Sequence, residues 1–240
     1  IKPDLVINDI LSTDVDDVRP LKDKGILVIN FEDLGKGAGH SDITINELFE
    51  TPVIKHQNIL WGHEYFFVRE EFDSARVRKY KDSVNSVLIT FGGIDALDCT
   101  SKAFLAINDF CIKNQIRINI VTGPGYRKYQ NLKALIRDYE HVFLSHATGI
   151  ISSIMENSDL AICSNGRTVY ELAHMNIPTI AIPQHEREGT HEFASKKTGF
   201  IVLNNSEPGS IGMQSDICNA FELLFRDNQY RKKLFDNMTN

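Results

Sequence analysis

Residues 86–93 read Ser-Val-Leu-Ile-Thr-Phe-Gly-Gly, and this stretch decides the fold class. A short, almost continuous apolar run that ends at glycines is typical of a strand buried on both faces of a parallel sheet. Runs of the same kind recur at residues 117–121, 142–144, 160–163, 178–182 and 199–203. Helical patterns separate these runs, so we expect residues 86–225 to form a complete doubly wound α/β domain.

The helices between these strands are expected at residues 101–114, 129–139, 150–157, 168–175 and 190–197. A closing helix is expected at residues 211–225, followed by a C-terminal helix within residues 226–240. The sequence therefore predicts strands and helices in strict alternation through most of the chain.

Upstream, strand patterns at residues 4–7, 25–29, 42–45 and 59–60 surround a short polar helix pattern at residues 14–24. We interpret residues 1–72 as the C-terminal part of an N-terminal Rossmann-like domain. The chain starts at Ile1 and enters a strand pattern almost at once, so we expect it to be a fragment that begins inside a domain. The charged stretch at residues 73–85 is predicted to be the linker.

Composition excludes several classes of protein. The 240 residues carry 26 Lys and Arg against 32 Asp and Glu, a net charge of −6, which disfavours a nucleic-acid partner. No apolar run approaches about 18 residues, so no membrane span is expected. The four cysteines form no C-x-x-C pair, which indicates a reduced, cytoplasmic protein. We expect no cofactor.

Gly92 and Gly93 are the first candidate ligand-binding residues. They follow a strand of the predicted sheet at the edge where doubly wound folds bind ligands, and glycines let backbone approach a phosphate or sugar closely. A plain tight turn explains the pair equally well, and the G-x-G-x-x-G fingerprint of dinucleotide binding is absent.

The second candidate segment follows the strand at residues 160–163 and opens a helix. Free amides at a helix start suit a diphosphate, which makes Ser164, Asn165, Gly166, Arg167 and Thr168 candidate ligands. The alternative is a capping box, in which Thr168 and Glu171 serve only the helix backbone.

The polar loop at residues 184–191 follows the next strand and provides Glu186, Glu188 and His191 as candidate sugar contacts or acid and base groups. A solvated charged loop with a helix cap at Thr190 is the alternative. A zinc-protease motif is excluded because His185 and His191 are six residues apart instead of four.

Three other features are interpreted as architecture. The turn Gly123-Pro124-Gly125 is left out of the site. Asp14 and Asp16 have the spacing of a metal-binding pair, but they stand at a helix start, where acidic residues complement the dipole, so no metal is expected. The Gly-rich stretch at residues 35–40 is expected to be a flexible surface loop.

These segments together resemble a known family. The resemblance rests on residues 4–9, 28–46, 62–65 and 68–72, then Thr90-Phe91-Gly92-Gly93, residues 158–162, Gly166-x-Thr168-x-x-Glu171 and residues 176–178. In their order and spacing they resemble the nucleotide-sugar hydrolase of pseudaminic acid biosynthesis and its spore-coat polysaccharide relatives. That family is similar to the lipid-II-forming N-acetylglucosaminyltransferase, which has the two-Rossmann-domain glycosyltransferase B (GT-B) fold.

The resemblance implies a UDP-sugar site in an interdomain cleft. The backbone near Ile151 would match the segment that reads uracil, and Glu171 the carboxylate on the ribose hydroxyls. Residues 164–168 would match the diphosphate cradle, and Gly92 and Gly93 would flank the sugar diphosphate.

The chain departs from the family pattern in two places. The family's loop with a catalytic His and an Arg corresponds to sequence before Ile1, so the catalytic residue is unknown. The family's Asn-Gln pair is replaced by residues 188–191, which leaves sugar contacts to Glu186, Glu188 or His191. This variant resembles glycosyltransferase-like regions fused behind cytidylyltransferases in nonulosonic acid pathways.

The first hypothesis is therefore a UDP-sugar hydrolase, or a glycosyltransferase that uses an acceptor hydroxyl, in surface polysaccharide or nonulosonic acid biosynthesis. A different class is a non-catalytic nucleotide-sugar-binding domain attached to a cytidylyltransferase. A 2-epimerase of the same fold ranks last.

Overall fold

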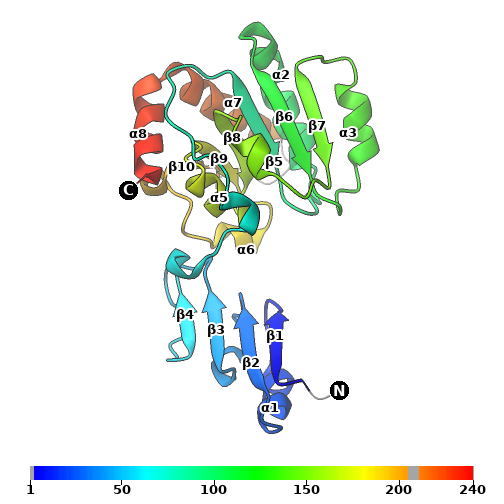
Figure 1. Cartoon of the computed structure of the whole chain (residues 1–240). Coiled ribbons are helices and arrows are strands. Elements are labelled where there is room, and N and C mark those ends of the chain that lie inside the picture. The colour runs from blue at the N-terminus through cyan, green and yellow to red at the C-terminus, as the bar shows by residue number, and fades with distance from the viewer. Residues whose placement is uncertain (1–2, 205–210, 240) are drawn as a thin grey trace. The chain divides into compact units, whose positions relative to one another are not determined.

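The computed structural model describes residues 3–204 and 211–239. The chain divides into two compact units (Figure 1): unit 1 is Ile1–Phe67 with His191–Phe193, and unit 2 is Val68–Thr190 with Ala194–Asn240. The structure does not describe residues 1–2, residues 205–210 or Asn240. These belong to the predicted segments 1–72, 86–225 and 226–240, respectively.

Unit 1 contains a parallel sheet in the order β1-β2-β3-β4. Its elements are β1 (Leu5–Asp9), α1 (Val15–Lys22), β2 (Leu27–Phe31), η1 (Ala38–His40), β3 (Ile43–Asn46), β4 (Ile59–Trp61) and η2 (His63–Tyr65). The expected strand-helix-strand beginning is confirmed. At the start of α1 the backbone N–H of Asp14 donates to Asp17 Oδ2 at 2.8 Å, so an acidic side chain serves the helix start.

The Gly-rich stretch at residues 35–40 is only partly the surface loop expected from sequence, because Lys36 and His40 are exposed but two residues between them are not. Gly37 and Ala38 are buried. A Cβ at Gly35 would lie 2.2 Å from Thr13 O, and a Cβ at Gly37 would lie 2.2 Å from Thr13 Oγ1. The glycines are required because the backbone of the loop packs directly on Thr13.

Unit 2 contains a parallel sheet in the order β10-β9-β8-β5-β6-β7. Its strands are β5 (Ser86–Thr90), β6 (Arg117–Thr122), β7 (Val142–His146), β8 (Leu160–Ser164), β9 (Thr179–Ile182) and β10 (Phe200–Val202). Its helices are η3 (Glu70–Phe72), α2 (Cys99–Lys113), α3 (Tyr129–Ile136), α4 (Ser152–Met155), α5 (Thr168–His174), α6 (Glu186–Gly189), η4 (Lys196–Thr198), α7 (Ile211–Arg226) and α8 (Asn228–Met238). The predicted fold class is confirmed.

The strand order of unit 2 reverses between β5 and β8. The chain runs from β5 to β6 and β7 on one side, and then returns to place β8 on the other side of β5. Such a switch point opens a crevice beyond the carboxyl ends of the two strands. The loops after β5 and β8 therefore meet there.

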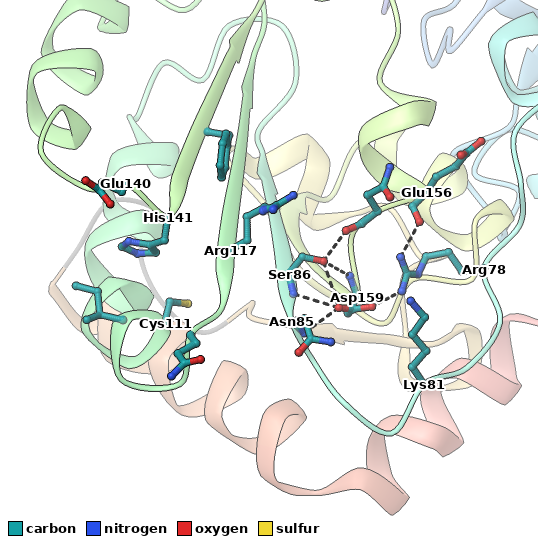
Figure 2. A pocket seen from close by; sticks show the side chains of 14 residues that line it. Arg78, Lys81, Asn85, Ser86, Cys111, Arg117, Glu140, His141, Glu156 and Asp159 are labelled. Atoms are coloured by element: carbon teal, nitrogen blue, oxygen red, sulfur yellow. Dashed lines mark hydrogen bonds and ion pairs between the residues drawn. The ribbon is translucent and has the colours of Figure 1, made fainter.

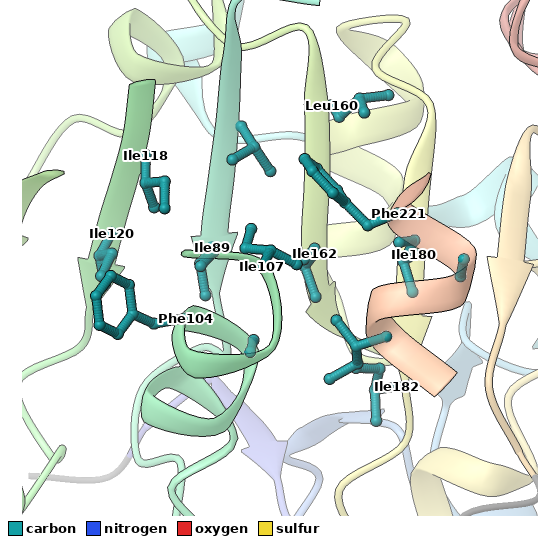
Figure 3. Packing of buried hydrophobic residues seen from close by; sticks show 14 of the residues in the cluster. Ile89, Phe104, Ile107, Ile118, Ile120, Leu160, Ile162, Ile180, Ile182 and Phe221 are labelled. Atoms are coloured by element: carbon teal, nitrogen blue, oxygen red, sulfur yellow. The ribbon is translucent and has the colours of Figure 1, made fainter. Parts of the chain in front are cut away.

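The core of unit 2 fills the space between one face of this sheet and two long helices (Figure 3). Alternate strand residues such as Ile89, Ile120 and Ile162 pack with Phe104 of α2 and Phe221 of α7, all fully buried. Each such side chain contributes roughly 1.5–3 kcal/mol of burial free energy. The sheet that presents the crevice is therefore rigidly supported from behind.

The helix expected at residues 190–197 does not form. The chain has only the four-residue α6 before this range, and the short η4 at its end. Between them, His191 packs edge-on against Phe49 at 5.3 Å, and Phe193 packs on His63 at 5.3 Å. This stretch is not helical because the side chains of His191 and Phe193 pack against residues of unit 1.

Candidate functional site

A cavity of about 710 Å³ lies beyond the carboxyl ends of β5, β8 and β9. Three loops line it, and they include seven of the residues predicted from sequence: Gly92, Gly93, Ser164, Gly166, Arg167, Thr168 and Glu188. Its volume falls in the range usual for small-molecule sites. The position is the topological switch point, where doubly wound sheets bind ligands.

Three glycines, Gly92, Gly93 and Gly166, form part of the cavity wall. Gly92 has φ +73°, which side chains other than glycine rarely adopt, and a Cβ at Gly93 would point into open space. A Cβ at Gly166 would lie 3.2 Å from Glu188 Oε1, so this carboxylate stands directly behind the glycine. A ligand can therefore contact main-chain groups at close range on two sides.

Gly123 supports the Gly92–Gly93 turn, although its own turn was interpreted from sequence as architecture outside the site. A Cβ at Gly123 would lie 2.4 Å from the Cα of Gly93 and 2.7 Å from Gly92 O. The backbone N–H of Gly125 also donates to Gly93 O at 2.9 Å. The turn after β6 thus holds the turn after β5 in place.

We expect Gly123→Ala to destabilise the protein by about 1–3 kcal/mol, because the new methyl group must displace the Gly92–Gly93 backbone. Thermal unfolding measures the effect. The control is Gly149→Ala, since a Cβ at Gly149 meets no atom within 4 Å. Equal melting temperatures for the two variants would contradict the packing described above.

The start of α2 is closed to a ligand phosphate. Asp95 is 6% exposed, and its carboxylate accepts the N–H of Cys99 at 2.7 Å and that of Thr100 at 2.8 Å. The first amides of this helix are therefore satisfied by a side chain. The glycine turn, and not the helix that follows it, is the part that can receive a ligand.

Glu188 is a buried carboxylate at the cavity wall, with a side chain 10% exposed. Its Oε2 accepts the N–H of Gln184 at 2.7 Å, and its Oε1 lies 3.8 Å from His185 Nε2. His185 Nδ1 accepts the backbone N–H of Glu188 at 3.3 Å, which assigns the ring proton of the neutral form to Nε2. Burial raises the pKa of Glu188, against the effect of the Gln184 amide.

Glu171 does not take part in a capping box. The helix α5 begins after Arg167, whose side chain does not cap it, and has only seven residues. Glu171 Oε1 instead accepts a hydrogen bond from Arg69 Nε at 3.1 Å. Burial raises the pKa of Glu171, and Arg69 opposes that shift.

The amide of Ile151 already has a partner. Glu71 Oε2 accepts the backbone N–H of Ile151 at 2.7 Å and that of Ser152 at 2.8 Å. Glu71 also forms an ion pair with Arg69, at 2.8 Å between Oε1 and Nη1. Ile151 and Glu171 are therefore linked through two residues of the segment that precedes β5.

The remaining predicted residues have other surroundings. Asn165 is buried behind the cavity, and its Nδ2 donates to Glu188 O at 2.8 Å. Glu186 lines a neighbouring hollow of about 450 Å³, which shares Gln184 and His185 with the main cavity. His191 belongs to unit 1, so it is not grouped with the others.

Sequence reasoning included Gln184 in the polar loop but not among the site residues, and it missed the Arg69–Glu71 pair. Gln184 lines the cavity, and its Nε2 donates to Phe91 O at 3.0 Å, which joins the turns after β9 and β5. Its position directly after a strand was the available signal. Arg69 and Glu71 stand in a charged stretch that gave no signal of burial, and only the fold brings them to α4 and α5.

A second hollow, of about 760 Å³, lies at the amino ends of the unit 2 strands (Figure 2). At one side of it Arg78 forms an ion pair with Asp159, and Arg78 Nη1 donates to the backbone Glu156 O at 2.8 Å. Asp159 Oδ2 accepts the N–H of Asn85 at 2.8 Å and that of Ser86 at 3.1 Å. These contacts tie the segment before β5 to the start of β8.

Two known proteins are similar to this chain in sequence. No family model matches the chain. Uncharacterized protein MJ1062 of Methanocaldococcus jannaschii is 26% identical over 228 residues, covering 87% of this chain and 46% of that protein. Spore coat polysaccharide biosynthesis protein SpsG of Bacillus subtilis is 23% identical over 205 residues, covering 82% of this chain and 59% of SpsG. The chain thus spans about half the length of these relatives.

Solved structures match more of the chain. MurG of Acinetobacter baumannii has a TM-score of 0.61 at 15% identity, covering 99% of this chain and 69% of MurG. Anabaena Alr3699/HepE in complex with UDP and glucose has a TM-score of 0.61 at 12% identity, covering 98% of this chain and 72% of HepE. This chain has the GT-B fold. Its two parallel-sheet α/β units match these glycosyltransferase structures.

Three findings bear on the other expectations from the sequence. No helix in residues 3–204 and 211–239 is long and apolar enough to cross a membrane. Burial raises the pKa of Cys99 and that of Cys111 to about 12, so both thiols stay protonated and act as small apolar side chains. Within the same residues, no group of three or more His, Cys, Asp or Glu side chains is placed to hold a metal ion.

Proposed function

We propose that this chain binds a UDP-sugar at the cavity beyond β5, β8 and β9 and takes part in cleaving its anomeric C–O bond. The observation that carries this proposal is a cavity of about 710 Å³ at the switch point, walled by the backbone of Gly92, Gly93 and Gly166. The diphosphate would lie between the turn after β5 and residues 164–168. Backbone N–H groups suit it because they cost little reorganisation when charge develops on the leaving group.

The nucleoside is proposed to lie toward Glu171, whose carboxylate would accept hydrogen bonds from the ribose hydroxyls. The sugar is proposed to lie toward His185, Glu186 and Glu188, where the two neighbouring hollows share a wall. A buried carboxylate beside an imidazole can orient sugar hydroxyls or carry a proton. His191 is left out, because it packs on Phe49 in unit 1.

The biological setting is proposed to be surface polysaccharide or nonulosonic acid biosynthesis, with water as the attacking group in a hydrolase. Similarity to SpsG supports the polysaccharide setting. Attack by an acceptor hydroxyl is the second candidate, supported by the fold of the spinosyn rhamnosyltransferase SpnG, with a TM-score of 0.60. A fused or associated cytidylyltransferase as partner rests on the sequence resemblance alone.

The test is a thermal-shift series with UDP, UMP, CMP, GDP and UDP-N-acetylglucosamine. At about 100 times its Kd a ligand adds about 2.7 kcal/mol of stability, or roughly 5–10 °C for a chain of this size. We expect UDP and the UDP-sugar to give this shift. Glu171→Ala should lower it to about half or less, because the variant loses the proposed hydrogen bond to the ribose.

Glu222→Ala is the matched control, because Glu222 also pairs with an arginine, Arg226, but lies on α7 away from the cavity. It should keep the full ligand shift. If none of the five nucleotides raises the melting temperature of the unmodified chain, the proposed function is wrong.

A further inference from the structure

A chain of polar contacts joins the segment after unit 1 to α4 and α5. It begins at the N–H groups of Ile151 and Ser152, which Glu71 Oε2 accepts. Glu71 Oε1 pairs with Arg69 Nη1 at 2.8 Å, and Arg69 Nε donates to Glu171 Oε1 at 3.1 Å. Residues separated by 80 to 102 positions in sequence thus form one continuous series.

The two carboxylates of this series are buried, and the arginine between them is not. The side chains of Glu71 and Glu171 are 11% and 12% exposed, whereas that of Arg69 is 52% exposed. The backbone is anchored next to them, because Phe72 is 1% exposed and packs edge-on against His174 of α5 at 6.1 Å. The guanidinium of Arg69 is therefore held at the surface by the carboxylates of Glu71 and Glu171, whose own positions are restricted by packing.

The geometry suits an arginine in particular. Arg69 uses Nε for one carboxylate and Nη1 for the other, and its guanidinium carbon lies 5.8 Å from the centre of the Phe72 ring. A planar guanidinium can donate to Glu171 through Nε while its Nη1 stays at ion-pair distance from Glu71, whereas a lysine ammonium is a single point charge. The orientation of Glu171 therefore depends on Arg69, and that of Arg69 depends on Glu71.

We propose that Arg69, held by Glu71, is a positioning residue that orients the Glu171 carboxylate to accept a hydrogen bond from the ribose hydroxyls of the nucleotide. This inference rests on the proposed function and deepens it. Arg69 engages Oε1 of Glu171, which would leave Oε2 as the oxygen that meets the ligand. The Ile151 and Ser152 amides donate to Glu71 and hold it in place.

The discriminating measurement is the ratio of affinities for UDP and 2′-deoxy-UDP, determined by calorimetric titration. For the unmodified chain we expect a preference for UDP of about ten- to hundredfold, the worth of one hydrogen bond to a charged group. Arg69→Met removes the charge but keeps most of the stem. It should bring the ratio close to one while the affinity for 2′-deoxy-UDP changes little.

Two further variants should have affinity ratios between those of the unmodified chain and Arg69→Met. Arg69→Lys restores the charge but only one of the two contacts, so its ratio should fall between the other two. Glu71→Gln loses the ion pair with Arg69 but keeps an oxygen for the two amides, and should also lower the ratio. Arg226→Met, which removes the partner of Glu222 on α7, is the matched control and should leave the ratio unchanged.

The pH dependence of the ratio provides a readout that a purely structural role would not move. The charged groups that act on Glu171 are Arg69, Glu71 and Arg167 before α5. The neighbouring thiol of Cys163 has its own pKa raised by burial and by the charge of Glu171. Arg69 lowers the pKa of Glu171, so its removal raises that pKa further. In the unmodified chain the preference for UDP should weaken as pH falls from 7.5 to 5.5 and Glu171 becomes protonated, whereas in Arg69→Met the ratio should stay near one at both pH values.

The outcomes separate this inference from the proposed function. If the unmodified chain binds neither UDP nor 2′-deoxy-UDP, the proposed function fails and this inference fails with it. If the chain prefers UDP and Arg69→Met keeps the full preference, only the positioning role is overturned. Tighter binding of UDP by Arg69→Met would also overturn it, since Arg69 would then compete with the ligand for Glu171. Should Arg69→Met fail to fold, Arg69→Lys and Glu71→Gln decide the question.

Discussion

Replacing Gly93 with leucine is expected to abolish nucleotide binding while leaving the fold intact. A Cβ at Gly93 meets no atom within 4 Å, and the residue does not have a positive φ, so a side chain is accepted without strain. That side chain would nevertheless occupy the cavity that Gly93 lines. We expect the thermal shift with UDP, roughly 5–10 °C in the unmodified chain, to fall to the noise of the measurement.

A size series provides the control for this prediction. Gly93→Ala adds one methyl group and should keep part of the UDP shift, whereas Gly93→Leu should keep none. Without ligand, both variants should melt within about 2 °C of the unmodified chain, since surface substitutions change stability by roughly 0.5 kcal/mol. A full UDP shift in Gly93→Leu would show that nucleotides do not bind in this cavity.

Replacing Arg78 with alanine is expected to lower the stability of the folded protein more than any other substitution proposed for this chain. Arg78 and Asp159 pair with side chains only 8% and 9% exposed, and Asp159 also receives the amides of Asn85 and Ser86 (Figure 2). Removing the arginine leaves a buried carboxylate without its counter-ion. Such a change costs about 3–5 kcal/mol, or roughly 10 °C or more in melting temperature here.

Arg226→Ala is the matched control for this prediction. It removes an arginine that pairs with Glu222 across one helical turn, with side chains 67% and 37% exposed. Exposed pairs of this kind contribute about 0.3–0.5 kcal/mol, so the melting temperature should change by about 1–2 °C. If Arg78→Ala is no more destabilising than Arg226→Ala in chemical or thermal unfolding, burial does not strengthen the Arg78–Asp159 pair.

Much of the fold was predictable from local pattern. The apolar runs that predict strands, such as residues 86–91 and 160–163, correspond to β5 and β8, because a strand buried on both faces must be apolar along its length. The glycine turn after β5 and the polar segment after β8 were also recognised as site candidates. Parallel strands place their carboxyl ends at one edge, so the side of the sheet that holds the site followed from the strand assignments.

The helix expected at residues 190–197 does not form, and the reason is physical. Helical periodicity describes how a segment packs on its own domain, but His191 and Phe193 pack on the aromatic residues Phe49 and His63 of unit 1. The same long-range packing removed His191 from the group of candidate sugar contacts. Local pattern carries no information about such partners.

The sequence by itself determined the α/β class, the order of the strands along the chain and the glycine turns, because each depends on near neighbours. Tertiary structure alone decided that β8 lies beside β5, that Gly123 supports Gly92 and Gly93, and that Arg69 joins Glu71 to Glu171. A hydrogen bond between residues 102 positions apart leaves no periodicity in the sequence. It exists because the folded sheet brings two distant segments to the same place.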